Sequence, residues 1–375
     1  MTNGRDRSIV FLCASYGTGG METCLNVLAE GLVKRGFSVI FILGELRKEH
    51  IPLPKEVDVH VLNRYVKPDQ RTVFTLTSSF LNARKKLAKI VRVYSKPIFI
   101  CMDMYPAWVC YSLRFKPLFL WLHFSIDRVF AVSKTWVVNR FLIRAADAVV
   151  VLGASMKEEI RNFFKEDVYK KTFIIPNPLT INHFGLQSLY SPGCNRFVYV
   201  GRLYNKQKRI DRMLKALSAL KDFNWELVIV GDGSDREYLV DLARTLRISN
   251  RVSWAGWQSN PWDYIKEKGG VEAVLLTSDY EGYPTVLVEA MANGIPCVAV
   301  DCPTGPSDII EDGVNGILIP LTSDEEIIER LREVFEGFLE GKFVFDEKKI
   351  RNSVVEHDPS VVVEKWIELI EKHKA

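Results

Sequence analysis

The sequence has no long apolar segment: no stretch of its 375 residues approaches the roughly 20 consecutive apolar residues that a membrane-spanning helix requires. It also has no low-complexity tract, and a composition of 47% hydrophobic and 26% charged residues is that of an ordinary globular protein. The apolar run Ile9–Ala14 is followed by Gly17, Gly19 and Gly20, where a signal peptide would continue apolar. We therefore expect a cytoplasmic protein without a secretion signal.

Patterns typical of metal sites are missing as well. The seven cysteines are an odd number, lie mostly in apolar, strand-like surroundings and show no Cys-x-x-Cys spacing, so we expect reduced core residues. The sequence has neither an Asp-x-Asp turn nor a His/Cys cluster with ligand spacing. We expect no bound metal and no tightly held cofactor.

Charge is distributed unevenly along the chain. Residues 1–185 carry 27 Lys and Arg against 15 Asp and Glu, whereas residues 186–375 carry 23 against 31. A basic first half favours an anionic partner. One basic stretch has helical spacing and consists of Arg84, Lys85, Lys86, Lys89 and Arg92. This stretch either lies on an anionic membrane, or holds a phosphorylated acceptor, or is a solvated helix face.

Short apolar strands alternate with amphipathic helices in both halves, which is typical of βαβ units and parallel sheets. Since 375 residues exceed what one hydrophobic core usually organises, we predict an α/β protein of two Rossmann-like domains. The domains are predicted at 1–180 and 196–358, joined by a polar linker at 181–195. The last segment, 359–375, is predicted to be a helix and is a candidate to pack back on the first domain.

The predicted strands are short apolar runs. In the first domain they are Ile9–Ala14, Val39–Leu43, Val57–Leu62, Ile98–Met102, Phe119–His123 and Ala148–Leu152. In the second they are Phe197–Val200, Glu226–Val230, Val252–Trp254, Ala273–Leu276 and Pro296–Val300. Ligands of open parallel sheets bind beyond the carboxyl ends of such strands, so we expect a site in the loops that follow them.

Two glycine-rich loops lead from a strand into a helix. The first contains Gly19 and Gly20 and either approaches an anion or merely turns the chain. The second contains Gly231, and its Ser234 or Asp235 is predicted to cap the next helix. Asp103, just past another strand, either orients an acceptor or caps the following turn.

Fixed positive charge follows the first strand of the second domain. Arg202 and Lys208 are predicted to lie where a diphosphate would bind. Lys206 and Arg209 are predicted to face solvent, because cations at a helix start oppose the helix dipole.

Two carboxylates flank a predicted helix start. Glu281 precedes the helix, Pro284 is predicted in its first turn, and Glu289 lies within it among apolar neighbours. A carboxylate in such surroundings either finds partners in the protein or serves a ligand, for example by accepting hydrogen bonds from two ribose hydroxyls.

These residues together resemble the retaining family 4 glycosyltransferases, whose GT-B fold has two Rossmann-like domains facing across a cleft. The resemblance covers most of residues 196–320 and rests on Gly201, Arg202, Lys208, Glu281 and Glu289 and on segments 294–297, 305–310 and 312–316. In the first half, segments 19–23 and 121–127 also match, whereas 45–118 match no known pattern. More narrowly, segments 123–127, 207–209, 256–262 and 301–306 are similar to bacterial galactosyltransferases of lipopolysaccharide synthesis.

The resemblance implies a role for each matched position. Glu289 would hold the ribose, and Arg202 with Lys208 would neutralise the leaving diphosphate. Glu281 and His123 would contact the donor sugar. Further donor contacts are expected from Gly231 and Trp257, and the Gly19–Gly20 loop would touch the diphosphate or the acceptor. Asp308 stands where the family often has Glu.

The implied function is transfer of a hexose, galactose or glucose, from a UDP-sugar to a lipopolysaccharide core or another lipid-linked glycan. The reaction would retain configuration without a metal, on an enzyme in peripheral contact with the cytoplasmic face of the inner membrane and without a nucleic-acid partner. Asp103 and Asp127 are candidate acceptor contacts. Two alternatives stay open: a nucleotide-sugar hydrolase or epimerase of the same fold, and a non-catalytic nucleotide-sugar binding module.

Overall fold

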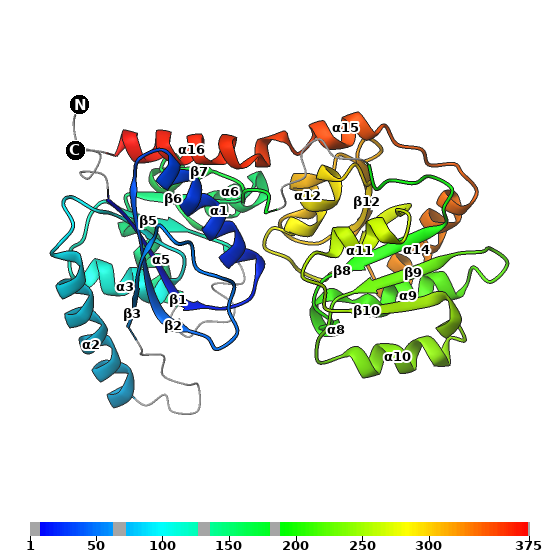
Figure 1. Ribbon diagram of the computed structural model, residues 1–375, viewed down its shortest axis with the longest axis horizontal. Coiled ribbons are helices and arrows are strands. Elements are labelled where there is room, and N and C mark those ends of the chain that lie inside the picture. The colour runs from blue at the N-terminus through cyan, green and yellow to red at the C-terminus, as the bar shows by residue number, and fades with distance from the viewer. Residues whose placement is uncertain (1–7, 63–72, 127–135, 181–187, 374–375) are drawn as a thin grey trace. The chain divides into compact units, whose positions relative to one another are not determined.

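In the computed structural model the chain divides into two compact units, residues 1–180 with 357–375, and residues 181–356 (Figure 1). The structure describes residues 8–62, 73–126, 136–180 and 188–373. The predicted linker 181–195 falls in the second unit, and the C-terminal helix falls in the first.

Among the described residues, the first unit has a seven-stranded sheet in which every neighbouring pair is parallel. In sheet order the strands are β3 (Asp58–Val61), β2 (Ser38–Leu46), β1 (Ser8–Tyr16), β4 (Ile98–Cys101), β5 (Leu118–Trp121), β6 (Ala148–Val151) and β7 (Thr172–Ile174). The central strands are buried along almost their whole length, as expected for a sheet with helices on both faces.

The helices of the first unit follow the strands along the chain. They are α1 (Gly20–Lys34), α2 (Val73–Val91), α3 (Met104–Ser112), α5 (Trp136–Ala145), α6 (Ala154–Phe163), α7 (Glu166–Lys170) and α16 (Pro359–Lys372). The last helix packs into the core through Trp366, whose ring centre lies 5.1 Å from that of Trp121 on β5. A Cβ on Gly31 would lie 2.3 Å from Val363, so glycine is what lets α1 and α16 approach closely.

The second unit has a six-stranded parallel sheet within the described residues. In sheet order the strands are β10 (Val252–Gly256), β9 (Glu226–Val230), β8 (Arg196–Val200), β11 (Ala273–Leu276), β12 (Cys297–Asp301) and β13 (Gly316–Pro320). Its helices are α8 (Asn205–Lys208), α9 (Ile210–Ser218), α10 (Arg236–Thr245), α11 (Pro261–Glu267), α12 (Thr285–Ala292), α13 (Pro306–Ile309), α14 (Asp324–Leu339) and α15 (Glu347–Asn352).

The prediction of two parallel-sheet α/β domains is confirmed, and each predicted strand is present within a few residues of its expected ends. Two strands were missed, β7 and β13, which lie at the edges of the two sheets. The helix predicted to include Pro284 in its first turn begins at Thr285, because Pro284 has a ψ of 88° and is the residue before the first turn.

Candidate functional site

The carboxyl ends of β8 and β9 bring two glycines into contact. Gly231 has a φ of 140°, and its N–H donates to the carbonyl of Gly256 at 2.8 Å. A Cβ on Gly231 would lie 1.9 Å from the carbonyl oxygen of Gly201. Position 231 therefore requires glycine, both for its backbone conformation and because a Cβ would clash with Gly201. The sequence predicted a donor contact at this position.

Lys208 and Glu281 form an ion pair beside these loops. Lys208 Nζ lies 2.6 Å from Glu281 Oε1, and the Ser278 hydroxyl donates to the same oxygen at 2.5 Å. The side chains are 19% and 7% exposed, so the pair is largely withdrawn from water. Two residues that the sequence assigned to diphosphate and sugar are thus in direct contact with each other.

Two more predicted residues lie at the surface of the second unit. Arg202 is exposed just beyond β8, and the side chain of Trp257 is 71% exposed just beyond β10. An exposed cation and an exposed indole are both suited to contact a nucleotide, the first through its phosphates and the second by stacking.

Glu289 lies half-buried on α12, an otherwise apolar helix. The indole N–H of Trp262 donates to Glu289 Oε2 at 3.1 Å. Trp262 is 1% exposed on α11, whose first turn is capped by the Asn260 side chain accepting from the Trp262 backbone N–H. Trp262 was not predicted from the sequence as the partner of Glu289, although Asn260 and Pro261 are typical of the start of the helix that carries it.

Two predictions about side-chain roles in this unit are wrong. Arg209 does not face solvent: its side chain is 17% exposed and forms ion pairs with Asp211, Asp279 and Asp324. Asp235 precedes α10 but does not cap it, and Ser234 does not cap it either. The Asp235 carboxylate instead accepts from the backbone N–H of Asn205 at 2.6 Å and so satisfies the first turn of α8.

In the first unit, Gly19 precedes α1 and Gly20 is its first residue. Glu22, which is 8% exposed, accepts from the backbone N–H of Gly17 at 3.1 Å, and a Cβ on Gly19 would lie 2.7 Å from its carboxylate. A carboxylate therefore already occupies the anion-binding end of α1, which makes this loop better suited to hydroxyl groups than to a diphosphate.

His123 is buried just beyond β5, with its ring 4.5 Å from that of Trp121. Burial lowers the pKa of His123 to about 3, so the imidazole is neutral at physiological pH. Its Nε2 has no hydrogen-bond partner in the part of the chain that the structure describes. A buried polar atom without a partner is unusual, and a ligand hydroxyl would satisfy it.

Asp103 precedes α3 but does not cap it. Its carboxylate accepts from the backbone N–H of Ala14 at 2.7 Å, which ties the ends of β4 and β1 together. Burial raises the pKa of the Asp103 carboxyl, and the nearby Glu22 adds to the rise. The other candidate acceptor contact, Asp127, lies outside the described residues.

The described residues contain neither a metal-binding cluster nor a helix able to span a membrane. Within residues 8–62, 73–126, 136–180 and 188–373 there is no group of three or more His, Cys, Asp or Glu side chains arranged to hold a metal ion. No helix in these ranges is long and apolar enough to cross a membrane.

Two family models match the chain in succession. The model described as Glycosyltransferase Family 4 matches residues 18–183, and the model described as Glycosyl transferases group 1 matches residues 187–340. The two matches divide the chain close to the boundary between the two units.

The chain is also similar to characterised proteins. It is 32% identical over 278 residues to the lipopolysaccharide 1,6-galactosyltransferase of Escherichia coli K12, covering 72% of this chain and 73% of that protein. The enzyme of the same name from Salmonella typhimurium is 33% identical over 276 residues, which are 69% of this chain and 72% of that protein.

Solved structures with the same fold include the apo form of the lipopolysaccharide outer core galactosyltransferase WaaB. It is 25% identical, with a TM-score of 0.78 over 97% of this chain and 99% of that one. The complex of Anabaena HepE with UDP has a TM-score of 0.72 at 18% identity, covering 97% of this chain and 100% of that one.

Proposed function

The chain belongs to the family 4 glycosyltransferases of GT-B fold, and on that premise we propose that it transfers a hexose from a UDP-sugar to a lipopolysaccharide core or another lipid-linked glycan. Membership makes it an enzyme, a hexosyltransferase, rather than a non-catalytic binding module. Galactose is the favoured hexose because the similar enzymes from Escherichia coli and Salmonella typhimurium are named as galactosyltransferases. UDP as the carrier is supported by the fold shared with a protein solved with UDP.

The observation that carries the proposal is the fixed orientation of Glu289. The buried Trp262 indole holds its carboxylate from one side. A carboxylate with a fixed direction accepts hydrogen bonds from two neighbouring ribose hydroxyls at little entropic cost. We assign Glu289 to the ribose, and Gly231 and Trp257 to the remainder of the nucleotide.

The chemistry follows from the charges near the carboxyl ends of the strands. Arg202 and Lys208 would neutralise the negative charge that develops on the diphosphate as the sugar departs, without a metal ion. Glu281 and the neutral His123 would hold hydroxyls of the donor sugar. The acceptor hydroxyl would attack from the face that the leaving group vacates and pass its proton to the departing phosphate, which retains the anomeric configuration.

The acceptor side belongs to the first unit. The Gly19–Gly20 loop, with Glu22 already at the helix start, would accept hydroxyl groups of the glycan. The basic residues in the second half of α2, and one just past its end, are exposed, namely Arg84, Lys85, Lys86, Lys89 and Arg92. On α5, Trp136, Val137 and Phe141 are also exposed. Exposed aromatic and basic side chains together suit the surface of an anionic membrane, and we assign them to peripheral contact with the cytoplasmic face of the inner membrane.

The experiment combines a donor screen with a transfer assay. The correct UDP-hexose should raise the melting temperature, because a ligand that binds only the folded state stabilises it. The same UDP-hexose should label lipopolysaccharide with a truncated core. Glu289→Ala should remove both effects. As a control, Glu267→Ala removes an exposed carboxylate at the end of α11 and should change neither. Full transfer by Glu289→Ala, or no response to any nucleotide sugar, contradicts the proposal.

A further inference from the structure

Arg209 has a backbone conformation that is unfavourable for its residue type. It lies between α8 and α9 with φ 47° and ψ 45°, in the left-handed region. A residue with a Cβ adopts that region at a cost of about 1–2 kcal/mol, which glycine does not incur. The surrounding structure must therefore hold this residue in place.

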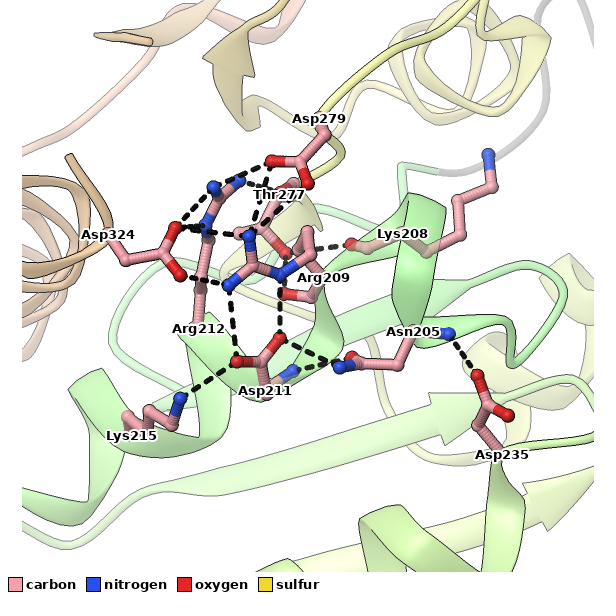
Figure 2. A network of polar contacts seen from close by, with 10 residues as sticks. All are labelled: Asn205, Lys208, Arg209, Asp211, Arg212, Lys215, Asp235, Thr277, Asp279 and Asp324. Atoms are coloured by element: carbon pink, nitrogen blue, oxygen red, sulfur yellow. Dashed lines mark hydrogen bonds and ion pairs between the residues drawn. The ribbon is translucent and has the colours of Figure 1, made fainter. Parts of the chain in front are cut away.

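The side chain of Arg209 belongs to an ion network shown in Figure 2. Its guanidinium contacts the carboxylates of Asp211, Asp279 and Asp324, and Asp324 is the first residue of α14. Arg212, which is 2% exposed, contacts Asp279 and Asp324 at 2.6 Å each. Hydrogen bonds from Arg209, and then from Arg212, lower the pKa of Asp324 to about 2, so the Asp324 carboxylate is ionised at neutral pH.

The network joins two loops. The Thr277 hydroxyl donates to the carbonyl of Arg209 at 2.8 Å and to that of Lys208 at 3.2 Å. The backbone N–H of Asp279 donates to the carbonyl of Gln207 at 2.9 Å, and Arg212 donates to the carbonyl of Thr277 at 2.9 Å. The turn after α8 is thereby connected, residue by residue, to the loop after β11.

These loops carry the two residues assigned to diphosphate and sugar. Lys208 comes immediately before Arg209, and Glu281 comes two residues after Asp279. In Figure 2 the Lys208 side chain extends away from the network, whereas its carbonyl oxygen faces Thr277. The network thus holds the backbone of Lys208 and leaves its ammonium group to Glu281.

We propose that Arg209 is a positioning residue for hexosyl transfer, which fixes the backbone of Lys208 and the 277–281 loop so that Lys208 meets the departing diphosphate. The inference rests on the proposed donor site. Lys208 acts on charge that develops in the transition state, so displacing it lowers kcat more than it raises the donor KM. A displacement of about 1 Å at a reacting group lowers the rate roughly 100-fold.

The first test is Arg209→Gly, which keeps the left-handed backbone accessible and removes the guanidinium. We expect kcat to fall by roughly 10- to 100-fold with the donor KM within about threefold of the wild-type value. The matched control is Arg247→Gly, because Arg247 is an exposed arginine of the same unit with a left-handed φ of 61°. It should retain full kcat. Arg209→Lys keeps the charge without the planar fork and should recover only part of the loss.

A double variant separates positioning from a general structural role. If Arg209 acts through Lys208, adding Arg209→Gly to Lys208→Met should not lower the residual transfer rate further, measured with enzyme in excess over acceptor. A double variant whose transfer rate is lowered by the product of the two single effects would overturn the proposal. Full kcat in Arg209→Gly would also overturn it if Lys208→Met has lost activity. Full activity of Lys208→Met would instead refute the donor-site assignment itself.

Discussion

Replacing Lys208 by Met should destabilise the second unit, because it leaves the Glu281 carboxylate without its cation. The Glu281 side chain is 7% exposed, and after the change only the Ser278 hydroxyl, among the partners described above, still donates to its carboxylate. Breaking one side of a fully buried pair costs about 3–5 kcal/mol. Because the Lys208 side chain is 19% exposed, the pair is not fully buried and the cost is smaller. We expect the free energy of unfolding to fall by about 2–3 kcal/mol.

The double variant Lys208→Met/Glu281→Gln removes the orphaned charge and separates stability from activity. Its free energy of unfolding should return to within about 1 kcal/mol of the wild-type value, because a neutral amide needs no counter-ion. Transfer should stay lost, since both donor contacts are gone. Urea unfolding followed by tryptophan fluorescence and a transfer assay on the same preparations measure the two effects. A double variant as unstable as Lys208→Met refutes the ion-pair reasoning, and a double variant that regains transfer refutes the donor assignment.

Three further predictions test other parts of the molecule. The folded pKa of His123, about 3, is below the unfolded value of about 6.5, so the unfolded state binds more protons between these values. Stability should fall as the pH drops from 6.5 towards 3, by up to about 1.4 kcal/mol per pH unit from this residue, and urea unfolding of His123→Gln should show a shallower fall. Gly231→Ala should lower the free energy of unfolding by about 2–4 kcal/mol, whereas Gly269→Ala, which meets no atom within 4 Å, should lose only about 1 kcal/mol. Excess chelator should leave the transfer rate of the purified enzyme unchanged. Abolished turnover would contradict a mechanism in which Arg202 and Lys208 neutralise the diphosphate without a metal ion.

The two-domain architecture was predictable because parallel strands buried on both faces are continuous apolar runs. β8, β9 and β11 contain such runs and were predicted within a residue of their ends. The strands that were missed are the short β7 and the glycine- and proline-bounded β13. Both are edge strands, and each has only two or three consecutive apolar residues beside a threonine, glycine or proline, which is too short a run to predict a strand.

The candidate site was predictable only where a residue stands out against its own neighbours. Glu289 does so, because it is a carboxylate within an apolar helix. Its partner Trp262 does not, because a buried tryptophan looks the same in sequence whether or not its N–H has a charged acceptor. The pairing of Lys208 with Glu281, 73 residues apart, likewise depends on two loops meeting at neighbouring strand ends.

Arg209 shows why local reasoning about charge fails at such a site. The prediction that it faces solvent followed from the dipole of the helix it begins, which disfavours a cation by about 0.3–1 kcal/mol. This unfavourable dipole energy is smaller than the attraction between the Arg209 guanidinium, which is 17% exposed, and the three carboxylates around it. One of these carboxylates, that of Asp324, lies 115 residues away in the sequence. A cation at a helix start therefore implies solvent exposure only when no distant segment brings acids to it. When a distant segment does bring acids to the cation, the resulting ion network holds two loops in a fixed relative position. Here those loops carry Lys208 and Glu281.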